Sequence, residues 1–190
     1  MIIYNKYQKL KNHDLYVDLL LDWIGIYKEK KTLKILDLGT GLGYVYYSLR
    51  KKGFKKVYAC DINKTFKQVD IFDFEGKFIY PNNFFDIVIT MNTIEHIKGN
   101  MHFLSEIKRV LKKGGKIYIL TCACEKQTIG TFYISFTHYQ PYTRESLEEG
   151  MKLFFKDVKV KYYKIIPKLW RVGLFIPLKL KYNLLGYGIK

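Results

Sequence analysis

The sequence is poor in the residue types that stabilise small secreted or fibrous proteins. Its 190 residues include three cysteines, four prolines and two tryptophans. Three cysteines are too few, and odd in number, for a disulfide framework, and they indicate a reducing compartment. We therefore expect a cytoplasmic protein that is held together by packing alone, which a domain of this length can provide.

Long apolar runs are missing as well. The longest, Val172 to Leu178, contains a proline and is far shorter than the roughly 20 residues that a helix needs to cross a bilayer. The first residues lack the apolar core and small-residue cleavage site of a signal peptide. We expect no transmembrane segment, and peripheral contact with a membrane is left open.

Acidic residues are scarce relative to basic ones. The 17 Asp and Glu residues face 33 Lys and Arg residues, for a formal net charge of +16. Such a balance suits a polyanionic partner, either nucleic acid or an acidic membrane surface. The chain is also crowded with Tyr and Phe (17 and 13 residues), so a general compositional bias is the alternative explanation of the lysines.

Apolar periodicity predicts one domain in which strands alternate with helices. The expected helices lie at residues 16–27, 44–52 and 103–111 and from Thr143 onward. The expected strands lie at residues 33–38, 56–60, 85–91, 116–120, 158–163 and 185–190. This order is typical of the α/β class, with a doubly wound, mostly parallel sheet that helices cover on both faces.

Such sheets bind ligands at the carboxyl ends of their strands, and a glycine-rich segment lies at one of them. The sequence DLGTGLG at residues 37–43 follows a buried strand and opens a helix. The glycines let the chain turn sharply and let a ligand approach the backbone. Asp61 ends the next strand, where a carboxylate is placed to accept hydrogen bonds from ribose hydroxyls.

The charge beside this loop separates two classes of ligand. Dinucleotide enzymes prefer the spacing G-x-G-x-x-G, whereas these glycines are at positions 39, 41 and 43. Asp37 would repel a pyrophosphate but suits an ammonium group. S-adenosylmethionine carries an ammonium, a sulfonium and a ribose and has no phosphate. We therefore favour it over a dinucleotide and keep a nicotinamide oxidoreductase as a remote alternative.

The chain resembles the class I, Rossmann-like S-adenosylmethionine-dependent methyltransferases, of the type that includes ubiquinone-biosynthesis and other small-molecule enzymes. The resemblance is carried by residues 37–43, Asp61, 84–88, 94–97, 106–116 and 138–145. It implies S-adenosylmethionine as cofactor and an antiparallel last strand. It also implies a single domain with a helical cap at 1–32, a cofactor-binding core at 33–150 and a variable segment at 151–190.

The resemblance assigns roles to individual positions. Asp37 and the backbone of the loop would hold the methionine part of the cofactor, and Asp61 would take the ribose. Asp70 stands where the family has an acidic residue near the adenine amino group. The residues expected to bind the cofactor are Asp37, Gly39, Thr40, Gly41, Gly43, Asp61, Asp70, Asn92 and Thr93.

One departure from the family lies between the second and third strands. Only residues 62–68 separate Asp61 from Val69, whereas parallel neighbours need a crossover of a dozen or more residues. We expect a missing or displaced third strand, or a segment 66–71 that returns in another direction. A degenerate, non-catalytic binding domain is the hypothesis that follows from this departure.

The reaction type requires no particular side chain, because methyl transfer is an in-line displacement with a neutral leaving group. Glu95, His96 and His138 are candidates for acid–base catalysis or for holding a divalent metal together. The set resembles that of small-RNA 3′-terminal 2′-O-methyltransferases, but Asn92 replaces one of the two glutamates. The alternative is that Glu95 and His96 fix a loop and that His138 caps a helix. We expect no metal.

The motifs do not disclose the methyl acceptor. We expect a small-molecule or lipid-like acceptor, with RNA as the alternative because of the basic charge. Residues 162–182 mix basic and apolar side chains. They would serve as a lid, a membrane contact or a nucleic-acid groove, and irregular packing is the alternative.

Overall fold

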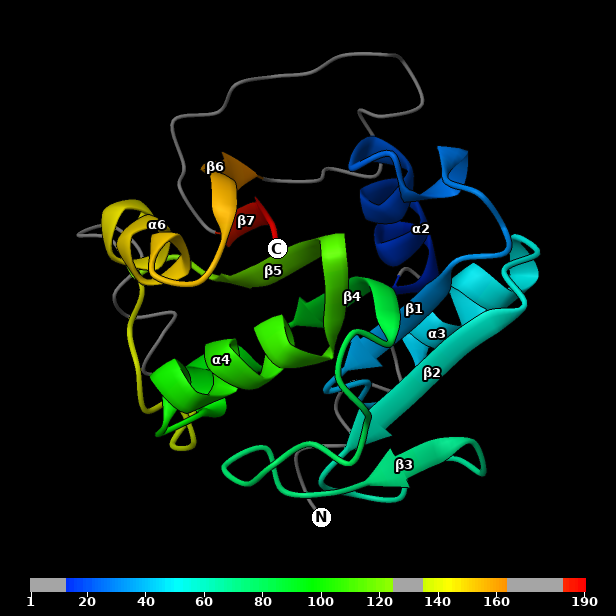
Figure 1. Ribbon diagram of the computed structural model, residues 1–190, viewed down its shortest axis with the longest axis horizontal. Coiled ribbons are helices and arrows are strands. Elements are labelled where there is room, and N and C mark those ends of the chain that lie inside the picture. Colours follow the sequence, from blue (N-terminus) through cyan, green and yellow to red (C-terminus); the bar gives the residue numbers. More distant parts are fainter. Residues whose placement is uncertain (1–12, 125–134, 164–182) are drawn as a thin grey trace.

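The structure, a computed structural model, describes residues 13–124, 135–163 and 183–190. Within these ranges a seven-stranded sheet has the order β3-β2-β1-β4-β5-β7-β6 (Figure 1). Residues 1–12 of the expected cap and most of the segment 162–182 lie outside the described residues. No helix within the described part of the chain is long and apolar enough to cross a membrane.

The strands run mostly parallel, as predicted. Parallel pairs join β1 to its neighbours β2 and β4, β2 to β3, and β4 to β5. The last strand, β7, is antiparallel to both β5 and β6, which confirms the predicted exception. The bounds are β1 Lys34–Leu38, β2 Lys56–Asp61, β3 Val69–Ile71, β4 Phe85–Met91, β5 Leu111–Cys122, β6 Lys156–Tyr163 and β7 Asn183–Ile189.

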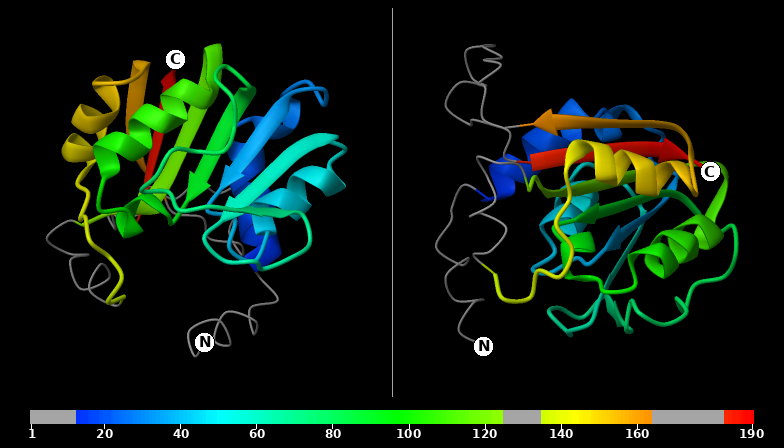
Figure 2. Two further views of the ribbon diagram at one scale, coloured as in Figure 1. Left: turned by 60° about the horizontal axis from the view of Figure 1, so that its bottom comes forward. Right: turned by 90° about the vertical axis from the view of Figure 1, so that its left-hand side faces the viewer.

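Helices cover both faces of the sheet (Figure 2). Helices α2 (His13–Trp23) and α3 (Tyr44–Lys51) enclose one apolar cluster, which includes Leu20, Ile35 and Leu49. Helices α4 (Asn100–Val110) and α6 (Arg144–Lys152) enclose the other. Two short 3₁₀ turns, η1 (Ile26–Lys28) and η2 (Ile94–His96), complete the described elements.

The first helix is confirmed, but its buried stripe differs from the predicted one. The sequence spacing predicts a buried stripe of Tyr16, Leu19, Leu20, Trp23 and Tyr27. In the structure Val17, Leu20 and Leu21 are buried, whereas Tyr16, Leu19 and Trp23 are only half-buried. The α-helix also ends at Trp23 instead of continuing to residue 27. Gly25 follows in the left-handed region at φ 79°, which ends an α-helix and which glycine adopts at low cost.

The expectation of a missing, displaced or reversed third strand was wrong. Strand β3 is present and parallel to β2, with Ala59 paired to Val69 and Asp61 to Ile71. Because Val69 lies beside Ala59, the chain travels back only about 7 Å along β2, two residues at roughly 3.3 Å each. Residues 62–68 manage this without a helix. Phe66 covers part of the gap by packing on Tyr46, with ring centroids 5.2 Å apart.

The connection from β3 to β4 also lacks a helix and is held by one ion pair. Arg109 Nε and Nη2 donate to the two carboxylate oxygens of Glu106 at 2.8 and 2.7 Å. The same guanidinium donates to the carbonyls of Phe78 and Tyr80, both at 2.9 Å. Glu106 in turn accepts the backbone N–H of Phe78 at 2.7 Å. The aromatic segment 72–84 is therefore fixed to α4 by charge-assisted hydrogen bonds.

We expect Arg109→Ala to lower the free energy of unfolding by about 2 kcal/mol or more, because several buried hydrogen bonds lose their donor at once. Urea denaturation measures the change. Arg144→Ala is the matched control, since Arg144 pairs with Glu145 and Glu148 at the surface, where solvent screening leaves such pairs little effect on stability. Equal losses for the two variants would contradict this account of the connection.

Candidate active site

The glycine loop lies between β1 and α3 and is pinned to the end of β2. The backbone N–H groups of Gly39 and Thr40 both donate to the carbonyl of Cys60 at 2.9 Å. Gly39, Gly41 and Gly43 all have positive φ, at 78°, 52° and 82°. A Cβ on Gly39 would lie 2.1 Å from the hydroxyl of Thr93, so close approach of the chain after β4 excludes any side chain there.

Asp37 and Asp61 lie at neighbouring strand ends, and consecutive loop residues link them. Thr40 Oγ1 donates to Asp37 Oδ2 at 2.6 Å, and the next residue, Gly41, donates its N–H to Asp61 Oδ2 at 2.9 Å. The backbone N–H of Tyr46 in α3 also donates to Asp37 Oδ2, at 3.0 Å. The two carboxylates that the sequence singled out therefore belong to one site.

The electrostatics of the site suit a cationic ligand. Burial raises the pKa of Asp37 to about 7, and nearby Asp61 raises it as well, against the hydrogen bonds from Thr40 and Tyr46. A cation next to a carboxylate favours its charged form. Among the described residues, no atom lies within 4 Å of the position of a Cβ on Gly41, so this part of the loop is open. Ammonium and ribose groups fit these residues.

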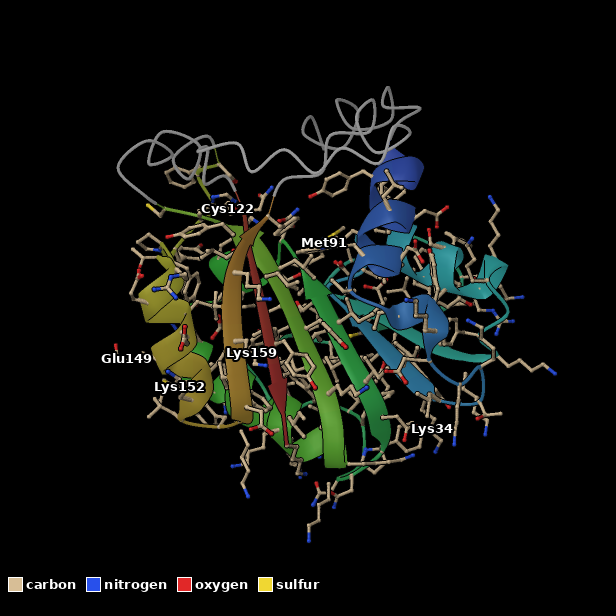
Figure 3. All side chains as sticks on the ribbon, turned by 90° about the horizontal axis from the view of Figure 1, so that it is seen from above. Lys34, Met91, Cys122, Glu149, Lys152 and Lys159 are labelled. Atoms are coloured by element: carbon tan, nitrogen blue, oxygen red, sulfur yellow. The ribbon has the colours of Figure 1, made fainter. Side chains whose placement is uncertain are left out.

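The turn after β4 closes the same end of the sheet. Met91, the last residue of β4, and Cys122, the last of β5, lie together at this end in Figure 3. Asn92 adopts φ 52° and donates its N–H to Leu120 O at 2.8 Å. Buried Thr93 directs its hydroxyl to the carbonyl of Met91, at 3.2 Å. The hydroxyl of Thr93 therefore contacts the protein backbone, and the predicted contact of this residue with the cofactor stays a prediction.

Asp70 lies in β3 beside Cys60 of β2. Its Oδ2 accepts a hydrogen bond from the hydroxyl of Tyr80 at 2.8 Å. Burial raises the pKa of Tyr80, so this phenol keeps its proton and remains the donor. Asp70 is therefore oriented by the aromatic connection, and its predicted contact with an adenine stays a prediction.

The structure brings Glu95, His96 and His138 together. One potential ligand atom from each lies within 4.8 Å of those of the other two, and the two imidazole rings have centroids 4.6 Å apart. The Glu95 carbonyl accepts the N–H of Tyr139 at 2.8 Å, which holds the segment around His138 against η2. The alternative role of His138 as a helix cap was wrong, because Thr143 caps α6.

Burial sets the protonation of this cluster. It raises the pKa of Glu95 to about 7, and the hydroxyl of Thr121 donates to Glu95 Oε2 at 2.8 Å. Burial and neighbouring His138 lower the pKa of His96. His96 Nδ1 lies 3.0 Å from the carbonyl of Thr137, which only accepts, and 2.9 Å from the hydroxyl of the same residue, which can accept as well. A proton on Nδ1 satisfies both contacts. Nδ1 therefore carries the proton, and Nε2 carries the lone pair of the neutral ring.

Sequence reasoning placed Thr93 in this site but did not foresee the role of its side chain, and it missed Thr121 altogether. Thr93 fixes the approach to Gly39, and Thr121 orients Glu95 from the end of β5. The only signal in the sequence was a polar residue near the end of an apolar strand. This pattern is too common to identify Thr121 as the partner of Glu95. Cys122 is the last residue of β5 and is buried.

Known proteins match both the sequence and the fold. A family model described as a methyltransferase domain matches residues 4–154. An S-adenosylmethionine-dependent methyltransferase from Archaeoglobus fulgidus superimposes with a TM-score of 0.78 at 20% identity, covering 99% of both chains. At this identity the structural match demonstrates a shared fold.

Two curated relatives match part of the chain. The protein-lysine N-methyltransferase EFM4 of Saccharomyces cerevisiae is 26% identical over 137 residues, covering 56% of this chain and 58% of the relative. The tRNA U34 carboxymethyltransferase of Mannheimia succiniciproducens is 25% identical over 132 residues, covering 57% and 40%. The alignments thus span 58% and 40% of these relatives' lengths. Because the family model matches most of the sequence, this chain belongs to the class I methyltransferases, whose cofactor is S-adenosylmethionine.

Proposed function

We propose that the protein transfers the methyl group of S-adenosylmethionine to an acceptor that enters beside His96. The observation that carries this proposal is the joint placement of Asp37 and Asp61, which the loop residues Thr40 and Gly41 link. One carboxylate faces a cationic amino-acid head and the other a ribose. A dinucleotide would instead place phosphates next to buried Asp37, which is unfavourable.

The proposed contacts follow the course of the loop. Asp37 would pair with the ammonium, and the backbone at Gly39 and Gly41 lets the methionine part lie against the chain. Asp61 uses each carboxylate oxygen once, for Gly41 N and Asn63 N, and keeps acceptor capacity for ribose hydroxyls. The remaining proposed contacts are Thr40 and Gly43 in the loop, Asn92 and Thr93 at the methionine end, and Asp70 at the adenine end.

The chain's own contribution to the reaction is positioning and proton handling. Bound S-adenosylmethionine supplies a methyl group that is already activated by the sulfonium. We propose that neutral His96 accepts the acceptor's proton at Nε2, because its Nδ1–H is held by the Thr137 carbonyl. Glu95 holds the segment of His138 through its backbone carbonyl and is a positioning residue.

Two classes of methyl acceptor are candidates. That the acceptor is a small molecule or lipid-like stays a prediction. That the protein belongs to the ubiquinone-biosynthesis type of methyltransferase stays one as well. RNA is the second candidate and is favoured by the net charge of +16 and by a tRNA-modifying relative. A screen with labelled methyl donor against small molecules, lipids and RNA separates the two classes.

We expect Asp37→Asn to weaken binding of S-adenosylmethionine by about 10-fold or more, because the ammonium loses its countercharge. In the wild type, the affinity should rise from about pH 6 to pH 8 as Asp37 ionises, with proton release on binding. The variant should show neither effect. Calorimetry in buffers of different ionisation enthalpy measures both. Absence of binding to the wild type would leave only the degenerate binding domain.

The same carboxyl makes a second prediction for the protein without cofactor. Asp37 has a pKa of about 7 in the folded state, well above the 3.8 of a free aspartate, so the folded state holds its proton more tightly. Its contribution to stability is present below about pH 4 and is lost as pH rises through 7. Asp37→Asn should therefore raise the melting temperature more at pH 8 than at pH 5. An equal shift at both values would contradict the pKa of Asp37.

For the acceptor side, we expect His96→Ala to lower kcat by about 100-fold or more while the cofactor Kd is unchanged, as loss of a general base does. His102→Ala is the control, because His102 lies on α4 and contacts Gly76 instead of the cluster. The activity of the wild type should also survive a chelator, since we expect no metal. Loss of activity in chelator would assign Glu95, His96 and His138 to a metal site instead.

A further inference from the structure

The two ends of the sheet carry different kinds of charge. The carboxyl ends bear Asp37, Asp61 and Glu95, which belong to the site described above. At the opposite end, where Lys34 is labelled in Figure 3, nitrogen-tipped side chains project from the molecule.

Strand register arranges these cations in a row. Lys34 and Lys56 begin β1 and β2 and are direct neighbours in the sheet. Beyond β4 in the strand order, Ile189 of β7 pairs with both Lys116 of β5 and Lys156 of β6. Because adjacent strands lie about 4.8 Å apart, the row crosses most of the width of the sheet.

Neighbouring segments extend this row into a surface. The last turn of α3 and the loop after it run to the same end, as does the turn that begins β5. Lys190 is held in place by the carbonyl of Leu111, at 2.7 Å. We define the basic edge as Lys34, Arg50, Lys51, Lys52, Lys55, Lys56, Lys112, Lys113, Lys116, Lys156 and Lys190.

Acidic residues only partly neutralise the basic edge. Lys112 pairs with Asp86 at 2.6 Å, and Lys116 pairs with Glu29 at 2.5 Å. Both pairs line a hollow of about 190 Å³, whose other lining residues include Lys113, Gly114 and Gly115. Lys113 itself is exposed, and the described residues provide no ion pair for it.

We propose that the basic edge is a docking surface for the phosphate backbone of RNA. Closely spaced, exposed lysines bind phosphates independently of sequence and release counterions when they do so. Anionic lipid headgroups would attract the same cations, but a curated relative of this chain is a tRNA-modifying enzyme, which favours RNA as the occupant. A nucleic acid therefore fits this surface better than a lipid surface.

The proposal goes beyond methyl transfer, because this surface and the cofactor lie at opposite ends of the strands. A strand of seven residues such as β4 is about 23 Å long. RNA docked at the basic edge reaches the methyl group only if it also runs along the side of the molecule. The surface then recruits RNA, and the carboxyl end of the sheet selects the atom that is methylated.

The test is binding of a fluorescent oligouridylate to the full chain, followed by anisotropy between about 50 and 200 mM salt. The triple variant Lys56→Gln, Lys113→Gln and Lys156→Gln should bind at least about 10-fold more weakly. Its slope of log K against log salt should be shallower by about 2, three contacts at roughly 0.7 each. All three side chains are exposed and form no ion pair with the described residues, so folding should be unaffected.

The matched control removes the same charge elsewhere, through Lys67→Gln, Lys77→Gln and Lys161→Gln, whose side chains are also exposed. It should keep the affinity of the wild type within about 3-fold. Equal weakening by both triple variants, or none by the first, would overturn the proposal. So would saturable binding to phosphatidylserine-containing vesicles without binding to RNA.

Calorimetry with S-adenosylmethionine separates this proposal from the proposed function. The basic-edge variant should bind the cofactor like the wild type, because no residue of the basic edge contacts the glycine loop. A wild type that binds RNA as predicted but binds no cofactor would refute methyl transfer and leave the docking surface intact. A wild type that binds cofactor but no RNA would refute the docking surface and leave methyl transfer intact.

Discussion

The site depends on two carboxylates that one loop holds at adjacent strand ends. Thr40 bonds to Asp37 and Gly41 bonds to Asp61, so the loop conformation and the positions of both charges are set together. Parallel pairing of β1 and β2 places these ends side by side. The loop in turn requires glycine where Thr93 approaches it. Fold and ligand recognition therefore share the same few contacts.

Holding Asp37 and Asp61 close together in a buried site lowers the stability of the folded protein, and the proposed binding of a cationic ligand explains why such a site is kept. Burial of Asp37 disfavours its charged form, and nearby Asp61 adds repulsion. A cationic ligand offsets both effects, so the empty site is less stable than the loaded one. Burial raises the pKa of Glu95 in the same way, on the side where we propose that the acceptor enters. The protein thus keeps buried carboxyl groups where a positively charged or hydrogen-bonding ligand is expected, at the expense of stability without ligand.

Much of the fold follows from local sequence signals. The DLGTGLG loop, the apolar strands and the end of β2 at Asp61 were predictable because each depends on neighbouring residues. The seven-residue crossover was misjudged, since the usual length rule assumes a full return along the strand and β3 needs only a short one. The partner of Glu95 depends on a contact between segments that are 26 residues apart in the sequence. Thr121 therefore carried no recognisable signal in the sequence.

The ionisation of Asp37 tests the central claim most directly. Carbon-13 NMR of the carboxyl group, with and without S-adenosylmethionine, reports its pKa in each state. The account predicts titration near pH 7 in the free protein and a clear downward shift when the cofactor is bound. Titration near pH 4 in the free protein, unchanged by cofactor, would contradict the placement of this carboxylate beside the ammonium group.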